Sequence, residues 1–93
     1  MSHRIVLSPD AEADISAIEA WYKTKQTSFV FAFRTELRVT LRVVAQYPYA
    51  FPEVRPGIRR ALMKRFPYLL YFREKNGVVS LLAVLHERRR QSF

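Results

Sequence analysis

The sequence predicts an α+β fold, in which a helical hairpin packs on one face of a small, mainly antiparallel sheet. Two observations carry this prediction. Apolar residues recur at helical spacing over two segments of the first half, and two apolar runs of the second half flank an Asn76-Gly77 dipeptide. The expected order of elements is β-α-α-β-β-β, in a single domain formed by residues 1–93.

The first two elements are a strand and a helix. Residues 3–7 are rich in aliphatic side chains and predict the strand. Ser8 can cap the N-terminus of a helix, and Pro9 suits the first helical position. The apolar residues that follow recur at helical spacing and predict one buried face, formed by Ala11, Ile15, Ile18 and Tyr22.

A second helix is expected over residues 28–46, after a polar break. Its apolar residues follow one another at steps of four, four, four and three: Phe29, Phe33, Leu37, Leu41 and Val44. A short loop joins the two helices, so they should pack as an antiparallel hairpin. The second helix carries more apolar residues than one face can hide. Part of it is therefore expected to face a partner, with Phe29, Phe33 and Leu37 as candidate contacts.

The remaining elements are expected to be strands. Residues 47–57 hold three prolines and a glycine, which predicts a loop. Residues 58–65 predict an amphipathic strand. The apolar runs 68–72 and 78–85 predict a β-hairpin, because Asn76-Gly77 suits a type I′ turn.

The positive charge lies in the second half of the chain. The sequence has 16 Lys and Arg against 8 Asp and Glu, a net charge of +8. Residues 1–54 are neutral overall, so the whole excess falls in residues 55–93. Such asymmetry predicts an anionic partner, either nucleic acid or an acidic protein. A surface charge that only keeps the protein soluble is the alternative.

His86 is the first candidate for chemistry, because it ends an apolar strand and could act as a general acid or base. The alternative is a histidine that only hydrogen-bonds the backbone. Basic side chains could clamp phosphates or stabilise charge on a phosphorus atom. They could equally form a rim that contacts acidic side chains of a partner. The candidates are Arg59, Arg60, Lys64, Arg65, Arg73, Arg88, Arg89 and Arg90.

Other chemistries lack their sequence signals. The chain has no cysteine, no cluster of residues at metal-ligand spacing and no glycine-rich phosphate loop, so no cofactor or metal is predicted. Its apolar runs are far too short to span a bilayer, and no secretory signal is evident. We therefore expect a cytoplasmic protein that does not associate with membranes.

Over nearly its whole length the chain resembles the RelE/ParE superfamily of bacterial toxins from type II toxin–antitoxin modules. Residues 8–15, SPDAEADI, are similar to the start of the family pattern, and residues 65–72, RFPYLLYF, together with 84–89, VLHERR, resemble its last two strands. This order of motifs is typical of ParE-like plasmid-stabilisation proteins. The resemblance implies a compact β-α-α-β-β-β fold and a hetero-oligomer with a cognate antitoxin, whose amphipathic, acidic C-terminal segment wraps the toxin. Phe29, Phe33 and Leu37 are then its candidate contacts.

The resemblance leaves two activities open. ParE-like members poison DNA gyrase by binding, so Arg59, Lys64, Arg65, Arg73, Arg89 and Arg90 would be target contacts. RelE-like members cleave mRNA on the ribosome, and His86, Arg60 and Arg88 would then be catalytic. The RelE branch usually has an arginine where this chain has Tyr68, and a lysine where it has Ala61. This incomplete signature favours gyrase inhibition. A family member that is inactive and only binds its antitoxin is a further possibility.

Overall fold

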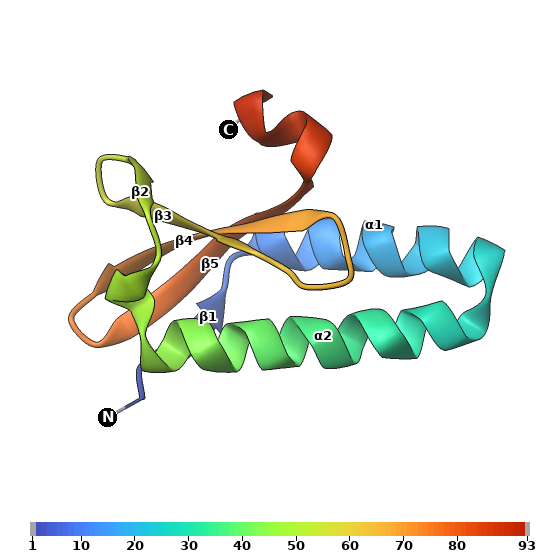
Figure 1. Ribbon diagram of the computed structural model, residues 1–93, viewed down its shortest axis with the longest axis horizontal. Helices are drawn as coiled ribbons and strands as arrows, with labels where there is room; N and C mark the ends of the chain where they lie inside the picture. The colour runs from blue at the N-terminus through green and yellow to red at the C-terminus, as the bar shows by residue number, and fades with distance from the viewer. Residues whose placement is uncertain (1, 93) are drawn as a thin grey trace.

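Two helices and five strands form a single compact unit (Figure 1). A computed structural model describes residues 2–92, with side chains as far as Arg89. In chain order the elements are β1 (Arg4–Leu7), α1 (Pro9–Lys25), α2 (Thr27–Gln46), the 3₁₀ turn η1 (Pro48–Ala50), β2 (Glu53–Arg55), β3 (Ile58–Leu62), β4 (Tyr68–Lys75), β5 (Val78–His86) and the 3₁₀ segment η2 (Glu87–Ser92).

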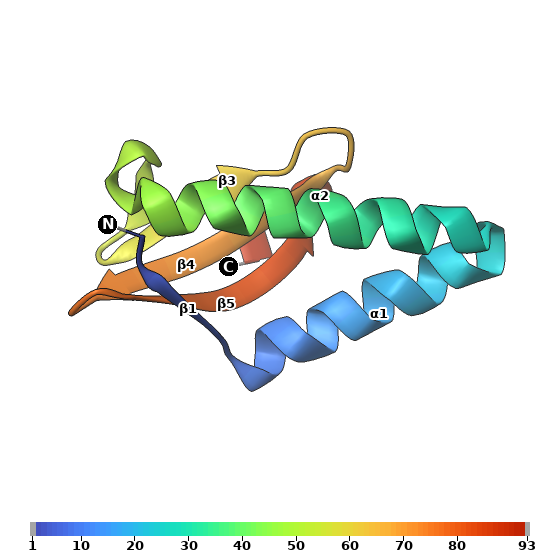
Figure 2. The ribbon, with the colours of Figure 1, turned by 90° about the horizontal axis from the view of Figure 1, so that it is seen from below.

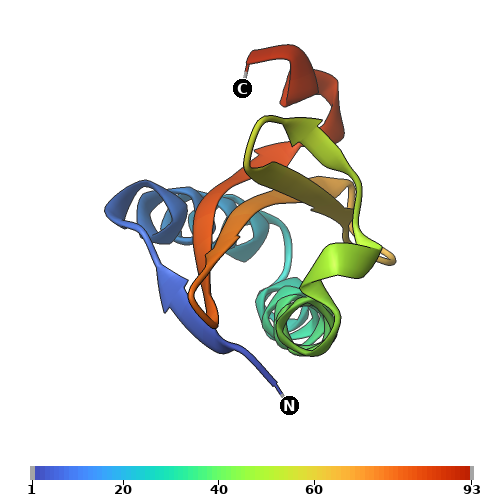
Figure 3. The same cartoon turned by 90° about the vertical axis from the view of Figure 1, so that its left-hand side faces the viewer.

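The strands form one mixed sheet in the order β1-β5-β4-β3-β2. β1 pairs in parallel with β5, and the other neighbours are antiparallel. The predicted α+β fold is therefore confirmed. One strand was not predicted: β2 lies inside the expected loop, where three residues between two prolines show no strand pattern. In the view along the helices, η2 lies above the sheet, and α2 lies below it (Figure 3).

The predicted start of the first helix is confirmed. The Ser8 hydroxyl accepts a hydrogen bond from the Ala11 N–H (3.0 Å) and donates one to the Leu82 carbonyl (3.1 Å). The cap therefore also fixes α1 to β5. The predicted hairpin turn is confirmed as well, because Asn76 and Gly77 have φ values of 54° and 79°, as a type I′ turn requires.

Both helices cover the same face of the sheet (Figure 2). The main core lies between them and this face, and its largest fully buried side chains include Phe33, Leu70, Phe72 and Leu81. A smaller apolar cluster lies on the opposite, open face and contains Leu69, Tyr71 and Ala83, with Val54, Ile58 and Leu85 partly buried around it. The centre of the open face is therefore apolar.

Candidate functional site

One candidate site lies on the open face of the sheet, between β3 and η2. A cavity of about 680 Å³ is lined there by Phe51, Pro52, Arg60, Leu62, Leu69, Glu87 and Arg88. Arg60 points to this face because it pairs with Tyr71, a member of the open-face cluster. The structure thus brings together two of the residues predicted to be catalytic, Arg60 and Arg88. Two guanidiniums beside an apolar wall can bind a phosphate or a carboxylate.

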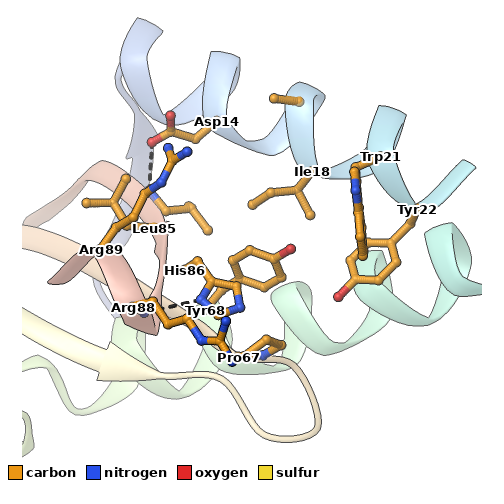
Figure 4. A pocket seen from close by; sticks show the side chains of 12 residues that line it. Asp14, Ile18, Trp21, Tyr22, Pro67, Tyr68, Leu85, His86, Arg88 and Arg89 are labelled. Atoms are coloured by element: carbon orange, nitrogen blue, oxygen red, sulfur yellow. Dashed lines mark hydrogen bonds between the residues drawn. The ribbon is translucent and has the colours of Figure 1, made fainter. Parts of the chain in front are cut away.

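A second cavity, of about 510 Å³, lies between α1 and the end of β5 (Figure 4). α1 contributes Trp21 and Tyr22 to its wall, and the other side holds Tyr68, His86, Arg88 and Arg89. Arg88 therefore borders both cavities. Burial raises the pKa of the Tyr68 hydroxyl, and a hydrogen bond with Tyr22 raises it further. Tyr68 is therefore a neutral hydroxyl at physiological pH and carries no charge into this cavity.

His86 lies at the second cavity and apart from Arg60. It pairs with Tyr68 across the sheet, on the face that the helices cover, and the two rings make an edge contact with centroids 5.6 Å apart. The His86 Nδ1 accepts a hydrogen bond from the Arg88 N–H at 3.2 Å. This bond assigns the proton of the neutral imidazole to Nε2. This contact agrees with the alternative in which His86 only hydrogen-bonds the backbone.

Asp14 belongs to the wall of the second cavity, although its place in the sequence does not single it out. Its Oδ2 accepts a hydrogen bond from the Val84 N–H at 2.9 Å (Figure 4). Val84 follows the irregularity of the β4–β5 ladder, where Tyr71 pairs with Ala83 and Phe72 with Leu81. Asp14 thus satisfies a backbone donor at this bulge and fixes α1 to β5.

The other predicted basic residues are dispersed over the molecule. Arg59 is half-buried and structural, because it donates to the Phe51 carbonyl (2.7 Å) and covers the Tyr49 ring. Lys64 and Arg65 are exposed in the loop between β3 and β4, and Arg73 is exposed on β4. Arg89 is exposed on η2, whereas the side chain of Arg90 lies outside the described residues. They do not form a single cluster.

Two of the three candidate partner contacts on α2 belong to the core. Phe33 has no exposed surface and Leu37 only 8%, whereas Phe29 is 43% exposed. Phe33 packs inward and offers no surface to a partner, so that assignment needs correction, whereas Leu37 packs mainly inward but still lines a depression along α2. The spacing of four that suggested them is the spacing of the buried stripe.

A polar cluster joins the N-terminal segment to the β4–β5 hairpin. The Glu74 carboxylate lies 3.3 Å from His3 Nε2 and accepts a hydrogen bond from the Gly77 N–H. A hydrogen bond from the Tyr49 hydroxyl, and then those from Gly77 and His3, hold the pKa of Glu74 below its ordinary value. In residues 2–92, no three His, Asp or Glu side chains form a group that could hold a metal ion.

Sequence reasoning missed the aromatic wall of the second cavity. Trp21 and Tyr22 are consecutive in α1, and only the fold brings them opposite Tyr68 and His86. The sequence predicts Tyr22 on the buried face of the first helix, but nothing in it tells which part of that face meets a strand end. Among the described residues, no helix is long and apolar enough to cross a membrane.

The element order and the helical hairpin on one face of the sheet are those that the resemblance to the RelE/ParE class of small toxins implies. A comparison with family models matched residues 5–91 to the ParE toxin of type II toxin–antitoxin systems, parDE. The chain therefore belongs to the ParE toxin family.

Among solved structures the chain is similar to one described as "Chromosomal ParDE TA system from P. aeruginosa", with a TM-score of 0.80. The sequences are 19% identical, and the match covers 91% of this chain and 96% of that chain. At this identity the similarity concerns the fold. A search among curated protein sequences found no match.

Proposed function

We propose that this ParE-family toxin inhibits DNA gyrase by binding, and that a cognate antitoxin neutralises it in a cytoplasmic complex. The observation that carries the proposal is the separation of the candidate catalytic residues. His86 lies on the helix-covered face with one nitrogen engaged by the backbone, whereas Arg60 lies on the open face. Acid–base cleavage needs its groups within hydrogen-bond reach of one substrate, and this arrangement favours binding instead.

In this proposal the target contacts are basic residues on the sheet side of the molecule. Arg60, which is half-buried, and the exposed Arg88 share the open-face cavity, and Arg73 lies on the same face, two residues beyond Tyr71 on β4. Guanidiniums of this kind can bind carboxylates of a protein or phosphates of gyrase-bound DNA.

RelE-like cleavage of ribosome-bound mRNA is the second candidate. The observation in its favour is the pairing of Arg60 with Arg88 around one cavity, next to Glu87. In such a mechanism the guanidiniums would stabilise charge on the transferred phosphorus, and Glu87 would be the nearby proton acceptor.

Purified protein separates the two activities. We expect the wild type and His86→Ala both to stabilise gyrase–DNA cleavage complexes, with most potency retained, and to leave mRNA on programmed ribosomes intact. Arg88→Glu should weaken gyrase inhibition by about 5- to 100-fold, the scale of one to two lost charge-assisted contacts. Cleavage of the mRNA, reduced about 10²- to 10⁴-fold by Glu87→Gln or by His86→Ala, would instead establish a ribonuclease. A protein with neither effect that still binds an antitoxin would be an inactive family member.

A further inference from the structure

A groove lies on the helical side of the molecule, away from the two candidate sites. The two helices diverge toward the sheet, and β1 runs between them (Figure 2). Along α2 and β1 a depression of about 550 Å³ is lined by Ser2, His3, Ile5, Arg34, Leu37, Arg38, Leu41, Arg42 and Ala45. We call it the α2–β1 groove.

The wall of the α2–β1 groove is a row of three arginines. Arg34, Arg38 and Arg42 are four residues apart, so they stand on one side of α2, one turn above another. The first half of the chain has no net charge, yet three of its six basic residues gather here. The fold therefore creates a positive surface that the charge distribution along the sequence does not reveal.

Only the ends of the α2–β1 groove have acidic partners. Arg34 binds the Glu19 carboxylate of α1 through two nitrogens, at 2.8 and 3.2 Å. At the other end, His3 lies 3.3 Å from Glu74. Between these two contacts, Arg38 and Arg42 are exposed and form no ion pair with an acidic residue of the described part of the chain.

The floor of the α2–β1 groove is apolar and continues to a free sheet edge. Ile5 and Leu41 are half-buried and pack against the main core. β1 is an edge strand, and two of its own residues, Val6 and Leu7, are 39% and 36% exposed. Cations are sufficient to bind the phosphates of a nucleic-acid backbone, which does not require an apolar floor. Arginines above an apolar floor therefore fit a protein segment better than a nucleic-acid backbone.

We infer that the α2–β1 groove binds an acidic amphipathic helix of the cognate antitoxin. Two of its carboxylates, one helical turn apart, pair with Arg38 and Arg42, while its apolar side chains cover Ile5 and Leu41. The match is one of spacing, because residues four apart on either helix stand about 5–6 Å from each other. The inference rests on the antitoxin partnership of the proposed function. It places the antitoxin on the side of the molecule opposite the open-face arginines, so that inhibitor and target have separate surfaces.

A double charge reversal tests the groove. The probe is the purified product of the reading frame adjacent to the toxin gene, and its affinity is measured by calorimetry. We expect Arg38→Glu with Arg42→Glu to lower this affinity about 100-fold, because two pairings become repulsive. The matched control reverses two exposed lysines of α1, Lys23→Glu with Lys25→Glu, with the same change in net charge, and should alter affinity less than about 3-fold.

Two further measurements keep the result decisive. The double arginine variant should still inhibit gyrase as the wild type does, and its melting curve should be the same as that of the wild type. Hydrogen exchange of the wild-type complex should show new protection in β1 and over residues 34–45. That pattern would support the groove even if the variant were poorly folded.

Four outcomes would overturn the inference. The first is an equal loss of antitoxin affinity in the arginine and lysine double variants, and the second is hydrogen-exchange protection confined to elements other than β1 and α2. The third is a free wild type of doubled mass that the double arginine variant converts to monomer, and the fourth is a double arginine variant that loses gyrase inhibition but keeps its antitoxin affinity. Failure of the wild type to bind the probe would refute both the antitoxin partnership and this site. Normal groove-dependent binding without gyrase inhibition would support the groove and refute the gyrase proposal alone.

Discussion

The two faces of the sheet differ in how they are covered. The helix-covered face packs against long apolar stripes, and Phe33, Leu70, Phe72 and Leu81 are completely buried there. The open face has a cluster of only three buried residues, Leu69, Tyr71 and Ala83, ringed by partly buried ones. Guanidiniums border this smaller cluster. The comparison teaches that stability is concentrated on one face, which leaves the other free to carry charged side chains for binding.

Truncation of one side chain on each face is the strongest test of this difference. Phe33→Ala should lower the free energy of unfolding by about 3–5 kcal/mol, because a ring with no exposed surface leaves a cavity. Leu85→Ala, at a half-buried position of the open face, should cost about 1–2 kcal/mol. Urea denaturation monitored by circular dichroism measures both. Equal losses would show that the open face is as important to stability as the helical face.

A polar contact on the helical side should have an intermediate effect. Asp14→Ala leaves the Val84 N–H at the β5 bulge without its acceptor and should cost about 1–2 kcal/mol in the same assay. Asp14→Asn is the matched control, because its side-chain oxygen can still accept the bond, and it should retain most of the stability. If both variants were as stable as the wild type, the bond from α1 to β5 would contribute nothing to the helical side.

The smallest effect is expected in the loop between β3 and β4, with the opposite sign. Arg65 has φ of 70°, a region that side chains other than glycine and asparagine rarely adopt. Arg65→Gly should therefore raise the free energy of unfolding by about 0.5 kcal/mol while it removes one proposed gyrase contact. Lys64→Gly is the control and should lower stability, since Lys64 has no positive φ. A loss of stability in Arg65→Gly would contradict the strain assigned to this residue.

Local patterns were sufficient for most of the fold. Ser8-Pro9 predicted the start of α1, the steps of four and three predicted α2, and Asn76-Gly77 predicted the hairpin turn. The parallel pairing of β1 with β5 has no such local signal, because it depends on where the helical hairpin returns the chain. The strand β2 was missed for a different reason, since three residues between prolines are too few to show alternation.

The candidate site was less predictable than the fold. The sequence identified Arg60 and Arg88 as separate basic candidates, but it could not tell that η2 would bring Arg88 beside Arg60. His86 was identified as a strand-end residue, and the fold then placed it with Tyr68, on the other face. Phe33 was predicted as a partner contact but is fully buried, because the same periodicity describes a buried stripe and an exposed one. Only packing decides between them.

The pairing of β1 with β5 has a consequence for the synthesis of the toxin. The bond from Ser8 to Leu82 joins residues 74 positions apart, and β5 is also the neighbour of β4 at the centre of the sheet. Contacts of such long sequence separation form only when both partners are available. A nascent chain that has not yet released β5 from the ribosome therefore cannot close its sheet, assemble the open-face cavity or complete the α2–β1 groove. The toxin becomes competent to act, and to be neutralised, at the same late step of its own translation.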